Sequence, residues 1–236
     1  MQRNFELASR KEATREKRKV SLHETELNSM FVCFNENLTS IEEKFSLIDR
    51  IMPSPDNDAI VNDIYRSQIV FLESALDYYM HNLGIYAMQQ MYKKNWEKTP
   101  GYKDLKVNIE TVIVAIENPE NNEWIESAII THHESKTYMR SKEIKGQLTL
   151  IFGKGMFDKV AYKLYPDNTL PGQHLSEVLD KYFFRRNKIA HQADRDHESN
   201  NKYSITREYV EIAIKEIKNF VIALQACALE KIANDT

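Results

Sequence analysis

The sequence predicts an all-α protein built as a helix bundle, and two observations carry this prediction. Glycine and proline number only six each in 236 residues, too few for a turn-rich β-sandwich or a glycine-dependent nucleotide fold. Apolar residues recur every three or four positions over four long segments, so each segment presents one apolar face of a helix. Packing these faces against one another gives a bundle with smaller helices around it.

Residues 1–22 are expected to form a charged N-terminal arm. This segment has a net charge of +4, whereas the whole chain has −3. Its acidic and basic residues lie three or four positions apart, which suits a solvated helix. The local positive charge leaves contact with RNA as the alternative role. The basic residues are Arg3, Arg10, Lys11, Arg15, Lys17, Arg18 and Lys19.

Two long helices are predicted next. The apolar stripe of the first runs over residues 27–52, and Pro53 and Pro55 end it because proline cannot continue a helix. The second helix is expected over residues 58–94, before the turn at Pro100-Gly101.

The middle of the chain, about 102–172, is less regular and is interpreted as a small, mostly helical insertion. Residues 105–116 carry several β-branched side chains, so helix and strand both stay open there. Three short helices are expected over residues 124–132, 142–152 and 156–164.

Two further helices complete the bundle. One is expected over residues 172–190, followed by a polar stretch at 194–201. Ser204 or Thr206 can cap the final helix, and Glu208 in its first turn is favoured by the helix dipole.

Cysteine usage and hydropathy predict a cytoplasmic protein. Cys33 and Cys227 are far apart among apolar residues and form no CxxC motif, so buried free thiols in a reducing compartment are expected. No stretch approaches the about 20 apolar residues that cross a bilayer, so no membrane contact is expected. The adjacent His132 and His133 point in different directions on a helix and make a poor chelate. They are interpreted as a surface helix end, and no metal site is expected.

The run that carries chemistry extends from Arg185 to Arg195. Asn187 and His191 lie four residues apart on one helix face, so the amide can hydrogen-bond the imidazole and fix its tautomer. Arg186 lies five residues from His191, about 140° around an ideal helix. One helix therefore cannot close both side chains over one small substrate, whereas a cleft shared by two copies of the helix can use both.

Residues 186–191, read as R-N-x-x-x-H, match the Rx4–6H motif of HEPN domains. The wider block over residues 179–228 resembles HEPN proteins of the RiboL-PSP type, with an Asp-Arg pair after the motif and a capped amphipathic final helix. The run over residues 67–79 is similar to the first core helix of that group. The resemblance implies one HEPN-like domain over residues 23–236, a four- to five-helix bundle with the insertion at about 102–172.

The same resemblance implies a function, which is metal-independent cleavage of RNA by attack of the ribose 2′-hydroxyl. This reaction leaves a 2′,3′-cyclic phosphate and a 5′-hydroxyl and needs no cofactor. In a homodimer with a composite active site, His191 would transfer protons and Arg186 would stabilise the phosphorane. Asn187 would orient His191 or hold a phosphate oxygen. Many such proteins act in toxin–antitoxin or anti-phage systems, so an antitoxin or regulatory partner is expected.

Other charged residues are expected to support this site. Arg185, Lys188 and Arg195 are candidate phosphate contacts around the cleft. Glu73 and Asp77 lie four residues apart on the polar edge of an apolar helix. They are expected to neutralise the arginines of the motif, with a paired acid–base site as the alternative.

Two blander interpretations stay open. Basic residues near a helix end are common, so Arg186 can cap its helix or pair with a carboxylate while His191 plays no catalytic part. The domain can also be a non-catalytic HEPN module that binds RNA or a protein partner. The combination of Arg186, Asn187 and His191 favours the endoribonuclease.

Overall fold

The regular elements of the protein are helices, which confirms the predicted all-α bundle. The computed structural model describes residues 27–51, 58–118, 121, 123–134 and 136–235, and the charged arm expected at 1–22 lies outside the described residues. The helices are α1 (Leu27–Ile51), α2 (Asp58–Tyr92), α3 (Pro100–Lys103), α4 (Ile109–Glu117), α5 (Glu123–Glu134), α6 (Ser141–Phe152), α7 (Met156–Leu164), α8 (Pro171–Gln192) and α9 (Arg207–Asp235).

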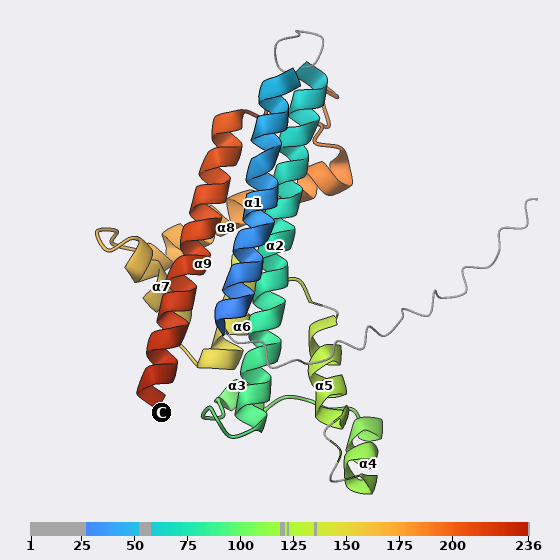
Figure 1. The fold of residues 1–236 in the computed structure, drawn as a ribbon, viewed down its shortest axis with the longest axis vertical. Coiled ribbons are helices and arrows are strands. Elements are labelled where there is room, and N and C mark those ends of the chain that lie inside the picture. Colours follow the sequence, from blue (N-terminus) through green and yellow to red (C-terminus); the bar gives the residue numbers. More distant parts are fainter. Residues whose placement is uncertain (1–26, 52–57, 119–120, 122, 135, 236) are drawn as a thin grey trace, which may run out of the picture.

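Helix α2 lies at the centre of the bundle. It contacts α1, α8 and α9, and also α5 and α6 of the middle segment. Figure 1 shows it beside α1 and near α9, with α8 crossing behind. Its side chains are buried on more than one face, so most other elements are positioned against this helix. Its fully buried apolar residues include Ile69, Leu72, Leu76, Met80 and Leu83.

Two buried hydrogen bonds fix α2 against its neighbours. Gln68 Nε2 donates to the carbonyl of Ile41 in α1 at 2.8 Å. Tyr79 Oη donates to Gln225 Oε1 in α9 at 2.9 Å. Because a buried polar group costs free energy when unpaired, each bond favours one register between the helices that it joins.

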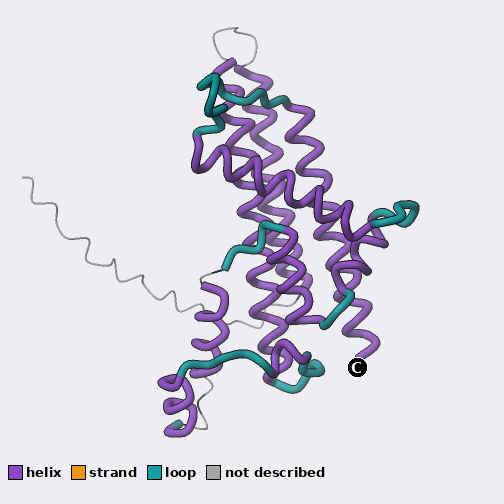
Figure 2. Tube along the Cα trace, turned by 180° about the vertical axis from the view of Figure 1, so that it is seen from behind, coloured by secondary structure: helices purple, strands orange, loops and turns teal. Residues whose placement is uncertain are grey.

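The predicted insertion divides into two parts. Helix α6 packs on α2 and α8, and α7 packs on α8 and α9, where Ile144, Leu148 and Val160 are fully buried. Helix α4 is the segment for which helix and strand were both open. It has no buried residue and lies at the outer end of the molecule beyond α5 in both views (Figures 1 and 2). Helices α6 and α7 therefore belong to the core, α5 packs on α2 through its buried Ile129 and His133, and α4 projects from the core.

Of the two residues predicted to cap the final helix, Ser204 and Thr206, one does so. Thr206 Oγ1 accepts a hydrogen bond from the backbone N–H of Tyr209 at 3.2 Å, and Glu208 lies in the first turn. Thr206 is therefore the cap, and the carbonyl of Ser204 instead accepts a hydrogen bond from Arg185.

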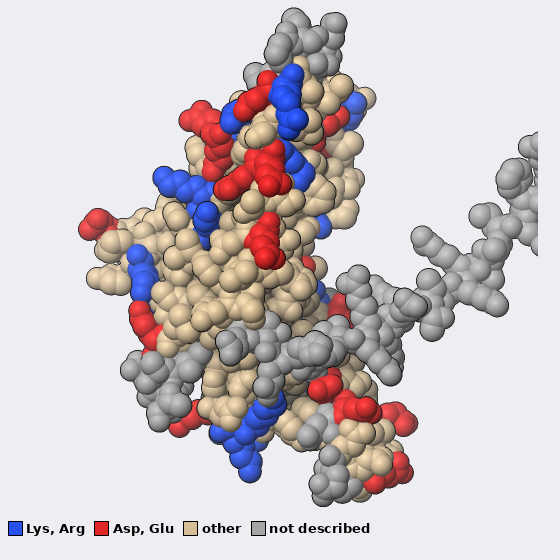
Figure 3. All heavy atoms as spheres, viewed as in Figure 1, with Lys and Arg blue, Asp and Glu red and all other residues tan. Residues whose placement is uncertain are grey.

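The surface combines charges of both signs. On the face seen in Figure 3, acidic and basic side chains of the described residues are interspersed and do not form one continuous basic patch. None of the helices in the described ranges is long and apolar enough to cross a membrane. Both cysteines are free: Cys227 is buried as expected, but Cys33 is only half-buried.

Gly84 is a point of close approach between α2 and the middle segment. A Cβ atom there would lie 1.8 Å from Gln147 Nε2 of α6 and 2.5 Å from His133 Cε1 of α5. We expect Gly84→Ala to lower the free energy of unfolding by about 1–3 kcal/mol through overpacking, although alanine is the better helix former. In the matched control Gly146→Ala in α6, the new Cβ meets no atom within 4 Å, so a gain of about 0.5–1 kcal/mol is expected. Urea denaturation measures both, and an unchanged Gly84→Ala protein would contradict the close packing.

Candidate functional site

The R-N-x-x-x-H run occupies the last two turns of α8. The helix ends at Gln192, and the two residues after it, Ala193 and Asp194, adopt left-handed dihedrals with φ of 51° and 57°. The backbone N–H of Asp194 donates to the carbonyl of Lys188 at 2.9 Å and closes the helix end. The whole run is therefore helical, and Arg186 and His191 keep the separation expected of one helix.

Asp194 ties the end of α8 to α2 through a buried ion-pair network. Its side chain is fully buried, and its Oδ2 accepts hydrogen bonds from Arg66 Nε at 2.7 Å and from Arg185 Nη2 at 2.8 Å. Arg66 also donates to the carbonyl of Tyr203 at 2.8 Å, and Arg185 to that of Ser204 at 2.9 Å. Since a buried charge requires partners, this network is an internal tie. The Arg185 guanidinium is thus engaged within the fold, whereas the sequence predicted a phosphate contact.

Sequence reasoning missed Arg66 and gave Asp194 no role of its own. The one local signal is an aspartate directly after a predicted helix end that carries basic residues. Arg66 lies 128 residues earlier in the chain, so only the fold shows that the two are partners.

The charge of Arg186 acts on the buried carboxyl group of Glu73. Its Nη1 donates to Asn187 Oδ1 at 3.1 Å, and its Nε is buried without a hydrogen-bond partner. Glu73 is fully buried, and neither of its carboxyl oxygens has a partner among the described residues. Burial raises the pKa of Glu73 to about 8, while the positive charge of Arg186 opposes this rise and Asp77 adds to it. Glu73 was expected to neutralise Arg185 or Arg186. Of these two, Arg186 is the arginine whose charge affects the pKa of Glu73.

Asp77 serves a different segment. Its Oδ1 accepts a hydrogen bond from the backbone N–H of Tyr138 at 2.5 Å and lies 3.6 Å from Nε2 of His81. Asp77 therefore anchors the loop between α5 and α6. Glu73 and Asp77 do not share a hydrogen-bond partner, so the described contacts give no support to the paired acid–base site.

His191 is exposed in the last turn of α8. Within the described residues its imidazole makes no hydrogen bond, ion pair or ring contact. The predicted bond from Asn187 is not formed, and the Asn187 Oδ1 is instead occupied by Arg186. The imidazole can therefore be reached by a substrate or by a second copy of the chain.

An aromatic side chain accompanies His191 on the outer face of α8. Phe184 is 49% exposed, and the guanidinium of Arg140 lies 5.5 Å from its ring centroid. Phe184, Lys188 and His191 follow one another at steps of four and three residues, so they share one helix face. This face is the part of the motif that a partner can cover.

Lys188 and Arg195, the other two predicted phosphate contacts, are exposed but already engaged. Lys188 Nζ lies 4.4 Å from the ring centroid of Tyr203. Arg195 Nη1 donates to the carbonyl of Asn200 at 2.5 Å. Either side chain would have to give up this contact to bind a phosphate.

The two adjacent histidines of α5 are not both at a surface helix end, so that interpretation is wrong for one of them. His133 is 2% exposed, and its Nδ1 lies 2.9 Å from Tyr138 Oη. Burial lowers the pKa of His133 to about 3, so the ring stays neutral at physiological pH. The ring is buried because α5 packs on α2 at Gly84. Over the parts of the chain that the structure describes, no group of three or more His, Cys, Asp or Glu residues is placed to hold a metal ion.

Comparison with known proteins adds no relative. No protein-family model, no curated protein and no solved structure matches this chain. The HEPN resemblance therefore rests on the residues themselves and stays a prediction.

The buried Glu73 predicts a pH-dependent stability. Because its folded pKa is raised to about 8 from 4.5, the folded protein binds more protons than the unfolded chain between these values. The contribution of Glu73 to the free energy of unfolding is thus highest below about pH 4.5 and is lost as the pH rises towards 8. We expect Glu73→Gln to raise the melting temperature at pH 8.5 by at least about 2–4 °C, the shift that about 1 kcal/mol produces, and by less at pH 5. Glu36→Gln, an exposed change in α1, should shift neither value. Equal effects of Glu73→Gln at both pH values would show that the carboxyl group is not buried as described.

Proposed function

We propose that this protein is a metal-independent endoribonuclease of the HEPN type that acts as a homodimer. The observation that carries the proposal is the state of two side chains in the last turns of α8. His191 is exposed without a partner among the described residues, and Arg186 Nε is buried without a hydrogen-bond partner. A proton-transfer group and a permanent cation with unused donors are the two groups that cleavage by a 2′-hydroxyl requires.

The reaction follows from these groups. The imidazole of His191 takes the proton of the ribose 2′-hydroxyl, whose oxygen attacks the adjacent phosphorus. Arg186 donates N–H groups to the phosphorane oxygens as their negative charge grows. The bond to the 5′-oxygen then breaks, and a second imidazole supplies the proton that this oxygen needs. Asn187 holds Arg186 Nη1, so its role here is to position the guanidinium.

The second imidazole comes from the partner in this proposal. Arg186 faces α2, while His191 points outward on the same helix, about 140° away. Two copies that meet through the outer face of α8 bring one histidine from each chain to a shared cleft. The exposed Phe184 supplies an apolar contact on that face.

The setting is proposed from the resemblance alone. It is a toxin–antitoxin or anti-phage system in the cytoplasm, in which an antitoxin or another regulator restrains the nuclease.

A second candidate is a non-catalytic module that binds RNA or a protein partner. It is favoured by the internal engagement of Arg185 and by the missing bond between Asn187 and His191. An imidazole that no neighbour orients is a weaker catalyst until a substrate or partner fixes it.

The first test is cleavage of a mixed RNA substrate in EDTA, with the product ends mapped. We expect the wild type to leave 2′,3′-cyclic phosphates and His191→Ala to lose about 10²–10⁴-fold in rate, the usual contribution of general acid–base catalysis. His197→Ala removes an exposed histidine six positions further along the chain and should cut at the wild-type rate. Equal cutting by His191→Ala would remove His191 from the mechanism. RNA binding without cutting by the wild type would favour the non-catalytic module.

The composite site is tested through Phe184. We expect Phe184→Glu to separate the dimer in light scattering and to abolish cleavage, because it places a charge in the proposed contact. Phe71→Glu is the matched control, since Phe71 is 50% exposed on α2 and has Lys44 Nζ 5.0 Å from its ring centroid. This control should leave both assembly and cleavage unchanged. A monomeric wild type that cuts RNA would contradict the composite site.

A further inference from the structure

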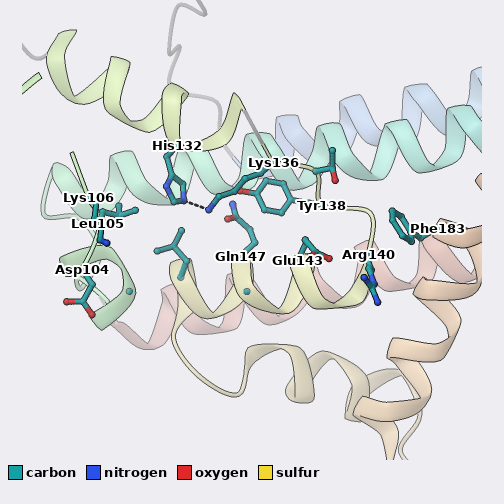
Figure 4. A pocket seen from close by; sticks show the side chains of 14 residues that line it. Asp104, Leu105, Lys106, His132, Lys136, Tyr138, Arg140, Glu143, Gln147 and Phe183 are labelled. Atoms are coloured by element: carbon teal, nitrogen blue, oxygen red, sulfur yellow. Dashed lines mark hydrogen bonds between the residues drawn. The ribbon is translucent and has the colours of Figure 1, made fainter. Parts of the chain in front are cut away.

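A cleft separate from the motif opens between the middle segment and α8. Its volume is about 860 Å³, within the roughly 300–1,000 Å³ typical of small-ligand sites. Its walls come from α3 and the chain after it, the end of α5, the loop between α5 and α6, α6 itself, and Phe183 of α8 (Figure 4). These parts of one chain thus form a concave site without a second copy.

The floor of this cleft holds a buried amide with unused hydrogen-bonding capacity. Gln147 is 2% exposed, and neither its Nε2 nor its Oε1 has a hydrogen-bond partner within the described residues. Figure 4 shows the side chain rising from α6 towards Lys136 and Tyr138. Gly84 allows it to lie close against α2. An unpaired buried amide is costly, and a ligand that both donates and accepts hydrogen bonds would remove that cost.

One side of the cleft offers a cation that is held in place. Lys136 Nζ donates to His132 Nε2 at 2.8 Å, as the dashed line in Figure 4 marks. Burial and the charge of Lys136 lower the pKa of His132, and because an ammonium group can only donate, Nε2 is the acceptor of this bond. Burial also lowers the pKa of Lys136, and a bound anion would reverse that effect. Lys106 and Arg140 add two further cations to the lining.

The remaining lining residues supply acceptors and an aromatic ring. Glu143 has a buried Oε2 without a hydrogen-bond partner, which can accept from a hydroxyl or an N–H group. Phe183 forms the wall next to α8. Cations for an anion, an amide, a carboxylate and an aromatic face together match a phosphate joined to a sugar and a planar base.

We infer that this cleft binds a nucleotide, with its phosphate at Lys136 and Lys106 and the polar edge of its base or sugar at Gln147 and Glu143. The ligand can be a free nucleotide or one nucleotide unit of a single-stranded RNA. In the second case the RNA would continue towards the motif, because Phe183 lies one turn before Arg186 on α8. The site itself does not rest on the proposed nuclease activity, since its lining is complete in one chain.

The test is calorimetric titration of the full chain with the four ribonucleoside 5′-monophosphates, with the parent nucleosides and inorganic phosphate, and with a short single-stranded RNA. The RNA arm uses His191→Ala protein so that the ligand is not cut. We expect nucleotides or RNA to bind, and Lys136→Ala to weaken that binding about tenfold or more, the effect of losing one charge-assisted hydrogen bond. Lys142→Ala, an exposed change in α6 outside the cleft, should bind as the wild type does.

Gln147→Leu separates binding from packing. If the amide binds a ligand, the variant should melt at the same or a higher temperature and should bind the nucleotide or RNA at least about tenfold more weakly. Binding of free monophosphates identifies a small-molecule ligand, and binding of RNA alone identifies a unit of the substrate chain. Three results would overturn the inference: no binding of any nucleotide or RNA, phosphate binding as tight as nucleotide binding, or unchanged binding by Gln147→Leu. None of these binding measurements depends on cleavage, so the cleft can be tested even if the protein does not cut RNA.

Discussion

The arrangement at the end of α8 depends on one buried carboxylate. Asp194 accepts hydrogen bonds from a guanidinium of α2 and from one of α8 on the same oxygen. A buried ion pair is stabilising only when its geometry is good and its charges are matched. The two arginines meet this requirement by also donating to the carbonyls of the chain that leads into α9. Three elements are therefore fixed at one point, and the direction of every side chain in the motif follows from it.

The network explains why neighbouring arginines have different roles. Arg185 is held by Asp194, so Arg186, the next residue, is turned by about 100° around the helix towards Glu73. A fully buried carboxyl group without hydrogen bonds destabilises a fold, and the positive charge of Arg186 opposes the rise in the pKa of Glu73 that burial and Asp77 cause. In the proposed reaction a substrate phosphate would compete for that charge. The proton on Glu73 would then be held more tightly, which keeps a second negative charge away from the phosphate.

Local patterns in the sequence were sufficient to predict the helices but not which residues of different helices pair with one another. The apolar stripes and the Pro53-Ser54-Pro55 break predicted α1 and α2 nearly to their ends. Helix and strand were both open for the segment of α4 because several of its side chains are β-branched, and the helix that it forms buries none of its residues. The motif could be read because its residues are contiguous. The pairing of Arg66 with Asp194 could not, since it joins residues 128 positions apart.

The same distinction separates the two candidate sites. In the motif, helix geometry points Arg186 and His191 to different sides, so the reaction proposed for them would require groups from a second chain. In the cleft, residues of α5, α6 and α8 converge because those helices pack on α2. The unpaired amide of Gln147 can be recognised only in the folded protein, where Gly84 leaves room for it against α2. A site such as the motif can be recognised from a contiguous sequence pattern, but the pattern does not show which groups of a second chain would complete it. A site whose residues converge from several helices cannot be seen until the fold is known, but its groups then lie in one chain, and the ligand class inferred for the cleft rests on them alone.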